Sequence, residues 1–268
     1  MRLYRGDLMY LFNCIMIFII GLVFGSFYNV VGYRLPNNIS IIYPPSNCPN
    51  CNHKLKFYEL IPILSYIFLH GRCRCCKKRI SFSYPFFEAL TGTLFLLSYI
   101  IFGLNIKFFI SITFISVLII ISISDIKYYI IPDEVLIFGS ILIILEMVIN
   151  SILNNKGMLN GVLFPVLNGL GAFCLMYLFK VFGDLVFQKE SLGGGDIKLM
   201  FIIGLFLGFD MSIVTVFIAS FIALPLSVIS LIRKNNNVLP FGPYLSIAAT
   251  IILFCNLNLD KILLFFTK

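Results

Sequence analysis

Residues 108–125 read FFISITFISVLIIISISD, an apolar run that ends on the acidic residue Asp125. Its length is close to the about 20 residues that cross the hydrocarbon core as a helix. Lipid tolerates only helices or closed barrels, and such runs are too long and too uniformly apolar for barrel strands. Similar runs occur at 8–31, 84–103, 134–153, 159–182, 197–209, 211–232 and 243–259. The sequence therefore predicts an all-α, polytopic membrane helical bundle with about eight transmembrane helices.

The composition supports the same class. The chain is 60% hydrophobic and 12% charged, with a mean hydropathy of +1.00, whereas soluble domains carry about 25% charged residues. A soluble protein and a disordered one are both excluded. The first run is long enough to span and no cleavage site follows it, so we expect an uncleaved helix. The run at 197–209 is short and follows three glycines, and it is still counted as a span.

The basic residues predict an orientation. If residues 32–83 face the cytoplasm, most of the 20 Lys and Arg residues lie on that side and both termini lie outside. Because these residues are spread over membrane-flanking loops, the net charge of +8 is assigned to topology and no nucleic-acid partner is expected.

The 32–83 loop contains two C-x-x-C pairs, Cys48 with Cys51 and Cys73 with Cys76. Such pairs present two thiolates each to a tetrahedral zinc ion, and nearby Lys and Arg favour the thiolate form. A cytoplasmic, zinc-binding and structural loop is predicted, since four protein ligands leave no position for substrate. Cys75 is a possible substitute ligand, and a set of unligated thiols is the alternative.

Two aspartates are placed at the ends of predicted spans on the same side, Asp125 and Asp196. Paired carboxylates that share a proton can activate water and polarise a peptide carbonyl, as in aspartic proteolysis. Glycines 193–195 would let a substrate backbone approach Asp196. Alternatively, Asp125 pairs with Lys127 and the glycines form only a flexible loop. Asp133, after Pro132, is expected to initiate a helix.

Together these segments resemble a known family, the type IV prepilin leader peptidases, also called prepilin peptidase/N-methyltransferases. The resemblance covers nearly the whole chain. Its motifs, in order, are GSFYNVVGYRLP at 25–36, the two C-x-x-C pairs, LIPILS at 60–65, GRCR at 71–74, YPFFE at 84–88, DIKYYIIPD at 125–133, GGGDIK at 193–198 and PFGP at 240–243.

The resemblance implies a multi-pass bacterial inner-membrane aspartic endopeptidase, with its active site at the cytoplasmic face. Its substrates would be type IV prepilins and pseudopilins, from which it removes a basic leader, so it would serve pili or protein secretion. The catalytic residues map to Asp125 and Asp196, in a G-x-G-D element shared with other intramembrane proteases.

The family's second activity, also implied by the resemblance, methylates the new amino terminus with S-adenosylmethionine. Candidate cofactor-binding residues are Gly25, Ser26, Asn29, Arg34 and Glu88. Alternatively, Gly25 and Ser26 form a close helix–helix contact and Arg34 is an interfacial cation. Residues 1–107 are expected to hold the first two spans, the zinc loop and the methyltransferase region, and residues 108–268 a six-span peptidase domain.

Two other classes remain open from the residues alone. A transporter or channel with a structural zinc loop would use mid-chain glycines and acids for ion binding, and it would predict inverted repeats and acids near the bilayer midplane. A membrane scaffold with a zinc loop would leave the paired aspartates unexplained.

Overall fold

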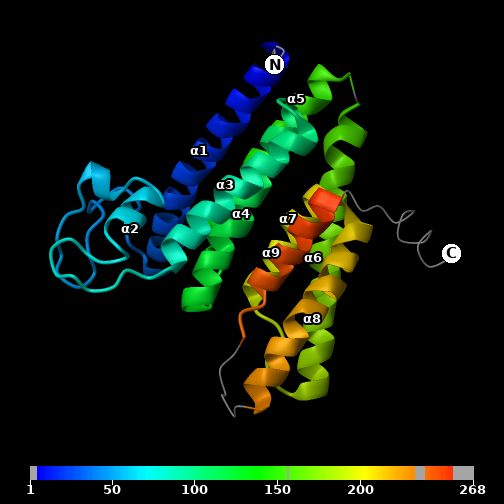
Figure 1. Cartoon of the computed structure of the whole chain (residues 1–268). Coiled ribbons are helices and arrows are strands. Elements are labelled where there is room, and N and C mark those ends of the chain that lie inside the picture. The colour runs from blue at the N-terminus through cyan, green and yellow to red at the C-terminus, as the bar shows by residue number, and fades with distance from the viewer. Residues whose placement is uncertain (1–4, 156, 233–238, 256–268) are drawn as a thin grey trace. The chain divides into compact units, whose positions relative to one another are not determined.

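The computed structural model describes residues 5–155, 157–232 and 239–255. Each apolar run forms a helix (Figure 1): α1 (Arg5–Arg34), α3 (Ser83–Phe102), α4 (Ile106–Tyr128), α5 (Asp133–Leu153), α6 (Phe164–Phe187), α7 (Gly194–Leu207), α8 (Phe209–Ile232) and α9 (Gly242–Cys255). No strand occurs among these described residues, and the all-α prediction is confirmed.

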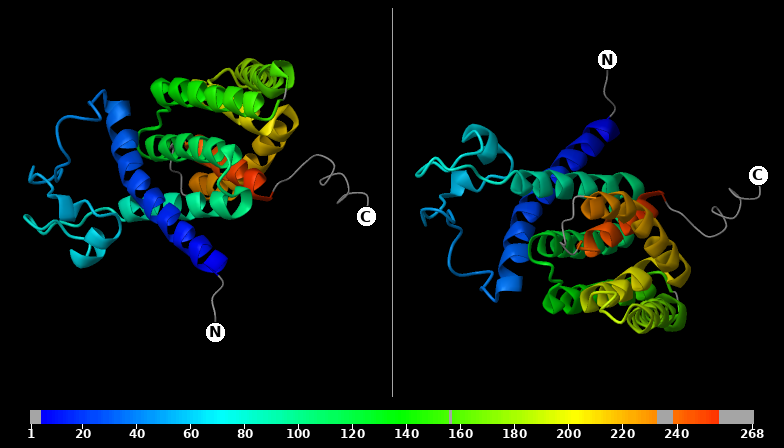
Figure 2. Two further views of the ribbon diagram at one scale, coloured as in Figure 1. Left: turned by 90° about the horizontal axis from the view of Figure 1, so that it is seen from above. Right: turned by 90° about the horizontal axis from the view of Figure 1, so that it is seen from below.

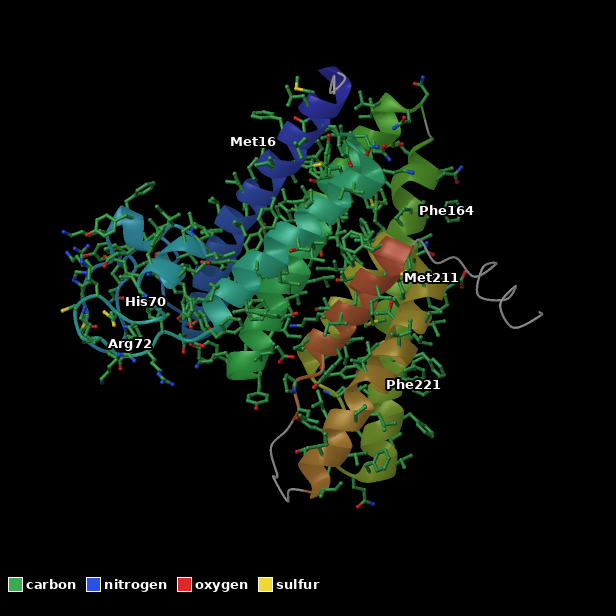
Figure 3. The ribbon with its side chains drawn as sticks, viewed as in Figure 1. Met16, His70, Arg72, Phe164, Met211 and Phe221 are labelled. Carbon is green, nitrogen blue, oxygen red and sulfur yellow. The ribbon has the colours of Figure 1, made fainter. Side chains whose placement is uncertain are left out.

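Helix length distinguishes two groups. Six helices among the described residues are long and apolar enough to cross a membrane. Side chains such as Phe164 and Phe221 project outward from them (Figure 3). Helices α7 and α9 have 14 described residues each, or about 21 Å at 1.5 Å per residue. That is less than the about 30 Å hydrocarbon core. Residues 256–259 of the last predicted span lie outside the described residues.

The chain forms two compact units, Met1–Phe108 and Phe109–Lys268. In the first, α1 packs along α3, and Figure 2 shows the two helices crossing. Glycines permit the close approach: a Cβ on Gly21 would lie 2.7 Å from the Cα of Gly92, and one on Gly25 would lie 2.8 Å from the Cα of Glu88. Small residues at such spacing are typical of membrane helix contacts.

The loop between α1 and α3 carries two short 3-10 turns, η1 (Leu35–Asn37) and η2 (Phe57–Glu59), and the short helix α2 (Leu64–Phe68). It lies at one end of the α1–α3 pair (Figure 1). Isolated bridges join Asn47 to Lys54 and Arg72 to Arg79. Each bridge closes one of the two C-x-x-C segments.

The second unit is built around α7. This helix packs along α6, and the side chains of Leu199, Met200, Ile202 and Ile203 are fully buried. Phe206 stacks on Phe114 of α4 with ring centroids 4.3 Å apart. The short π-helical turn η3 (Leu159–Leu163) precedes α6. A helix enclosed by protein does not have to match the bilayer thickness, which explains how a 14-residue element can carry Asp196.

Candidate active site and metal centre

Asp125 lies in the last turn of α4, and its side chain is turned into the protein. It is 6% exposed, and its Oδ2 accepts a hydrogen bond from the backbone N–H of Gly242 at 3.0 Å. Gly242 is the first residue of α9, so the carboxylate faces the positive end of that helix. The alternative pairing fails, because the structure forms no ion pair between Asp125 and Lys127, both of which it describes.

Asp196 lies in the first turn of α7, where a carboxylate is favoured by the helix dipole. It is 8% exposed, and its buried Oδ1 has no hydrogen-bond partner among the described residues. Asp125 and Asp196 are close enough for their charges to repel each other. The predicted co-location of the two carboxylates is therefore present in the structure.

Ile131 holds the two aspartate segments against the start of α9. Its side chain lies 2.7 Å from where a Cβ on Gly195 would be, and 3.3 Å from one on Gly242. A Cβ on Gly242 would also lie 2.8 Å from the Oδ2 of Asp125. Glycine at both positions is thus a condition for the approach of α7 and α9 to the carboxylate. Nothing lies within 4 Å of a Cβ on Gly194.

We expect Gly242→Ala to lower the cleavage rate by about a hundredfold, since displacement of a reacting group by about 1 Å can cost that much. The added methyl group would meet the Asp125 carboxylate. Gly157→Ala is the matched control, because nothing lies within 4 Å of the added Cβ and the residue is outside the aspartate site, and it is expected to retain the wild-type rate. Equal rates for the two variants in a cleavage assay would contradict this geometry.

Asp133 does more than initiate α5. It is the first residue of that helix and lies in the first turn, while the N-cap position belongs to Pro132. Its two carboxylate oxygens accept hydrogen bonds from the Nζ of Lys198 at 2.7 and 2.8 Å. The ion pair therefore joins the segment that follows Asp125 to α7, whose first turn contains Asp196.

We expect Asp133→Asn to keep most of the cleavage activity, because both partners are about half exposed and exposed ion pairs contribute only about 0–1 kcal/mol. Lys198→Gln should have a similarly small effect, and the double variant should be no worse than either single one. The measurement is the cleavage rate of all three. Near-complete loss of cleavage in Asp133→Asn would show that Asp133 takes part in the chemistry.

The four predicted zinc ligands gather at one point. The Sγ atoms of Cys48, Cys51, Cys73 and Cys76 all lie within 4.8 Å of one another. The pairs Cys48–Cys76 and Cys51–Cys73 are 3.9 Å apart. Tetrahedral zinc with Zn–S bonds of about 2.3 Å requires sulfurs about 3.8 Å apart. The donor set and its spacing fit zinc, and exposed Cys75 lies outside the cluster.

The two C-x-x-C segments have the same backbone design. The N–H of Cys48 donates to the carbonyl of His53 and that of Cys73 donates to the carbonyl of Lys78. Asn52 and Lys77, one residue after the second cysteine of each pair, both have φ in the left-handed region, at 54° and 58°. Two equivalent turns thus present two thiols each to a common point.

Backbone amides favour a thiolate in this cluster. The N–H groups of Cys76 and then Cys75 lower the pKa of Cys73 to about 6. At Cys51 the N–H of His53 also favours the thiolate, but burial and hydrogen bonds with the other three thiols outweigh it and raise the pKa of Cys51 to about 12. Without metal, the cluster therefore does not hold four thiolates at neutral pH.

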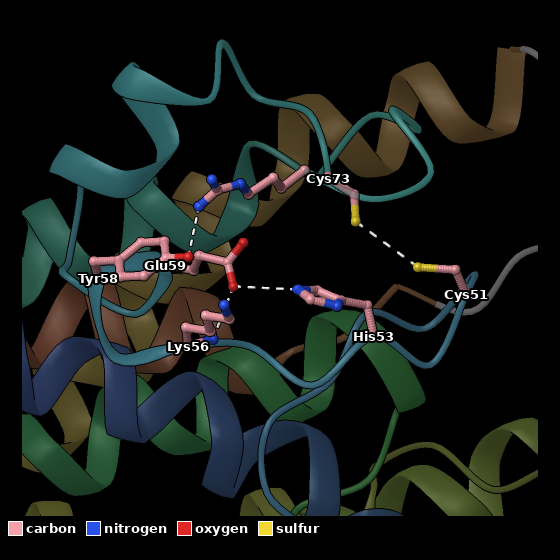
Figure 4. A network of polar contacts seen from close by, with 7 residues as sticks. Cys51, His53, Lys56, Tyr58, Glu59 and Cys73 are labelled. Atoms are coloured by element: carbon pink, nitrogen blue, oxygen red, sulfur yellow. Dashed lines mark hydrogen bonds and ion pairs between the residues drawn. The ribbon is translucent and has the colours of Figure 1, made fainter.

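A polar network supports the first turn (Figure 4). The carboxylate of Glu59 accepts a hydrogen bond from the N–H of Lys56 at 2.8 Å and lies 3.3 Å from the Nε2 of His53. The amide of Lys56, followed by His53 and Arg74, lowers the pKa of Glu59. Arg74 also donates to the hydroxyl of Tyr58. His53 is thus paired within the loop, and the four thiols remain the candidate ligands.

Four of the five candidate cofactor residues lie at the α1–α3 contact. Gly25 packs against Glu88, and the hydroxyl of Ser26 hydrogen-bonds to the Glu88 carboxylate. The amide nitrogen of Asn29 donates to the carbonyls of Gly25 and Tyr84, while its buried Oδ1 has no partner among the described residues. This orphaned acceptor fits a hydrogen-bond donor such as the amino groups of S-adenosylmethionine.

The two charged candidates, Arg34 and Glu88, have protein partners. Arg34 donates to the carbonyls of Ser40 and Ile41, beyond the end of α1. Oε2 of Glu88 accepts the N–H of Ile63 at 2.8 Å. The close helix–helix contact expected as the alternative for Gly25 is present. The unpaired Oδ1 of Asn29 remains as a buried acceptor at this contact.

Glu146, a half-buried acid inside an apolar run, was not among the residues predicted from the sequence. Glu146 of α5 accepts a hydrogen bond from the hydroxyl of Thr113 of α4 at 2.9 Å, and its buried Oε2 has no partner among the described residues. The available signal was an ionisable residue well inside an apolar run, which is costly and usually has a role. The pairing partners Gly242 and Lys198 were also missed, although both lie in quoted motifs.

The fold and both sites define a class of protein. Residues 19–102 match the bacterial peptidase A24 N-terminal domain, and residues 112–228 match the type IV leader peptidase family. The first match contains the cysteine loop and the second contains both aspartates. The chain belongs to the type IV leader peptidase family and is a membrane enzyme.

Named relatives agree with this membership. A prepilin leader peptidase/N-methyltransferase of Bacillus subtilis is 35% identical over 94% of this chain and 97% of its own length. A protein of the same name from Neisseria gonorrhoeae is 30% identical over 89% of this chain and 89% of its own length. One from Pseudomonas aeruginosa is 30% identical over 88% of each chain. No solved structure matches the chain. With six helices of spanning length in its described part, the chain is a multi-pass inner-membrane protein.

Proposed function

We propose that this enzyme removes the basic leader from type IV prepilins and pseudopilins at the cytoplasmic face of the membrane, and then methylates the new amino terminus. The observation that carries the peptidase activity is the buried pair Asp125 and Asp196, held together by α4, α7 and α9. The transporter alternative is disfavoured because both acids lie in terminal turns of their helices.

The pair acts by sharing one proton. One carboxylate takes a proton from water as the water attacks the scissile carbonyl, and the other donates to the carbonyl oxygen. The Gly242 amide fixes Asp125, whereas the buried Oδ1 of Asp196 has no partner within the described part of the chain and is left to bond to water or substrate. Breakdown of the tetrahedral intermediate returns a proton to the leaving amine, so the enzyme is regenerated without a covalent intermediate.

We assign the methyl transfer to residues 1–107 and the peptidase to residues 108–268. S-Adenosylmethionine, when bound, supplies an electrophilic methyl group for the neutral amine. Asn29 would accept a hydrogen bond from a polar group of the cofactor through its buried, unpaired Oδ1. Ser26 and Glu88 would shape the wall, and the four thiolates with zinc would keep the adjoining loop folded.

The methyltransferase assignment predicts a selective defect. We expect Asn29→Leu to reduce methylation at least about tenfold, because it removes a buried hydrogen-bond acceptor worth about 1–3 kcal/mol when lost, while cleavage changes little. Asn13→Leu, which makes the same change on the same helix at a residue bonded to the hydroxyl of Tyr99, is the control and should change methylation little. Equal loss of cleavage and methylation in Asn29→Leu would point to misfolding instead.

Mass spectrometry of a leader-bearing prepilin co-expressed with this chain tests the proposed function in one spectrum. We expect the mass of the mature pilin carrying one added methyl group. An unprocessed prepilin alongside well-folded, membrane-inserted enzyme would contradict the proposal. A pilin that is cleaved but not methylated would contradict the second activity alone.

A further inference from the structure

The start of α2 is hydrogen-bonded to a residue in the second turn of the transmembrane helix α3. The backbone N–H of Ile63, the N-cap of α2, donates to Oε2 of Glu88 at 2.8 Å. Glu88 lies five residues after Ser83, where the 20-residue spanning helix α3 begins, or about 7.5 Å along its axis. A 20-residue helix is about 30 Å long and matches the hydrocarbon core. The bond therefore places Ile63 near the boundary between headgroups and acyl chains.

The segment around this bond presents apolar side chains outward. Phe68 is 76% exposed, Ile67 59% and Leu64 51%, and Leu60 and Ile61 are also exposed. The ring of Phe82, 67% exposed and adjacent to the start of α3, contacts Tyr66 of α2 and Phe86 of α3. We call this set the α2 patch: Leu60, Ile61, Leu64, Ile67, Phe68 and Phe82. It continues the apolar surface of α3 into the loop.

Most backbone amides of this segment are paired within it, which suits an element at membrane depth. The amides of Leu64, Ser65 and Ile67 donate to the carbonyls of Pro62, Ile61 and Ile63, respectively, and those of Leu69 to Arg72 also donate within the segment. Ile63 itself has φ of 60°, a costly value for a β-branched residue. The Glu88 carboxylate accepts the amide that this turn would otherwise leave unpaired.

Exposed basic residues flank the patch on both sides along the chain. They are Lys54, Lys56, Arg72, Arg74, Lys77, Lys78 and Arg79, and Figure 3 shows Arg72 in the outer loop. Apolar side chains beside Lys and Arg are typical of segments that lie in the interface of an anionic membrane, where the basic residues are attracted to the lipid headgroups.

We propose that the α2 patch inserts into the headgroup–acyl boundary of an anionic bilayer and anchors the zinc loop to the membrane surface. The Glu88–Ile63 bond sets the depth of the patch, and the flanking basic residues contact lipid phosphates. Glu88 is a positioning residue in this arrangement. The loop thereby remains at the interface where the amino terminus of a membrane-anchored substrate would emerge.

The chain contains no tryptophan, so a single introduced indole reports its own surroundings. The experiment places Phe68→Trp in the full-length protein, reconstituted in bilayers that contain phosphatidylglycerol and lipids brominated near the top of the acyl chains. We expect blue-shifted emission and a large loss of intensity from bromine quenching.

Cys75→Trp, at an exposed position of the second C-x-x-C turn, is the control and should lose much less intensity. Ile67→Trp repeats the test if Phe68→Trp folds poorly. Zinc content serves as the folding control.

Other outcomes would overturn the proposal. Red-shifted emission quenched by aqueous iodide would place the patch in water. Blue-shifted emission that bromine does not quench would mean that protein, such as the second unit or a substrate, covers it. Equal quenching of Trp at positions 68 and 75 would remove the special role of α2. Quenching that is unchanged in phosphatidylcholine alone would contradict the contribution of the basic residues.

Discussion

Replacing either Asp125 or Asp196 with Asn is expected to abolish nearly all leader cleavage, a loss of at least about 10²–10⁴-fold. Asn can neither accept the proton of water nor return one to the leaving group. The two carboxylates are buried and close enough to repel, so they act as one unit. The double variant should therefore be about as inactive as either single variant.

Conservative changes at the same positions test the geometry. Glu at position 125 adds a methylene and shifts the carboxylate by about 1 Å, which can cost about a hundredfold, because the Gly242 amide fixes where Oδ2 must lie. Asp133→Asn controls for loss of an acid near the site. Robust cleavage by either Asn variant, with normal membrane insertion and zinc content, would reject the aspartic mechanism.

Removing the thiols of Cys48, Cys51, Cys73 and Cys76 together is expected to eliminate bound zinc and unfold the loop. Gently purified wild-type protein should contain about one zinc per chain, because the sulfur positions already match tetrahedral coordination. Metal binding contributes directly to folding in elements too small to bury a core. We expect the fourfold Ser variant to be cleaved rapidly by added protease within residues 44–80.

Cys75→Ser is the matched control for this experiment, since Cys75 is exposed and outside the cluster. It should keep its zinc and its protease resistance. Elemental analysis that finds no zinc in the wild-type protein would contradict a structural metal centre. Loss of zinc from Cys75→Ser would show that the fourth ligand has been assigned wrongly.

The predictable part of this fold is set by local pattern. Apolar runs predicted every long helix, because lipid leaves the backbone no other solution. The C-x-x-C spacing predicted the metal cluster, since two equivalent turns suffice to place four thiols. Helix length was less predictable: α7 is a short, enclosed helix, and burial by neighbouring helices is not visible in one run of sequence.

Pairing across the chain could not be read from sequence in the same way. Lys198 and Asp133 are separated by 65 positions, and Gly242 and Asp125 by 117. The role of Asp133 changed accordingly, from helix initiation alone to an ion pair with Lys198. Likewise Glu88, expected to bind cofactor, has its Oε2 bonded to the amide of Ile63, because the loop folds back on α3.

The central claim is that Asp125 and Asp196 form one peptidase site. It is tested most directly by incubating the purified wild-type protein, and separately the Asp196→Asn variant, with a leader-bearing prepilin and recording the mass of the product. We predict loss of the leader with the wild-type protein and an unchanged prepilin with the variant. Equal leader removal by both, with zinc content and folding matched, would contradict it.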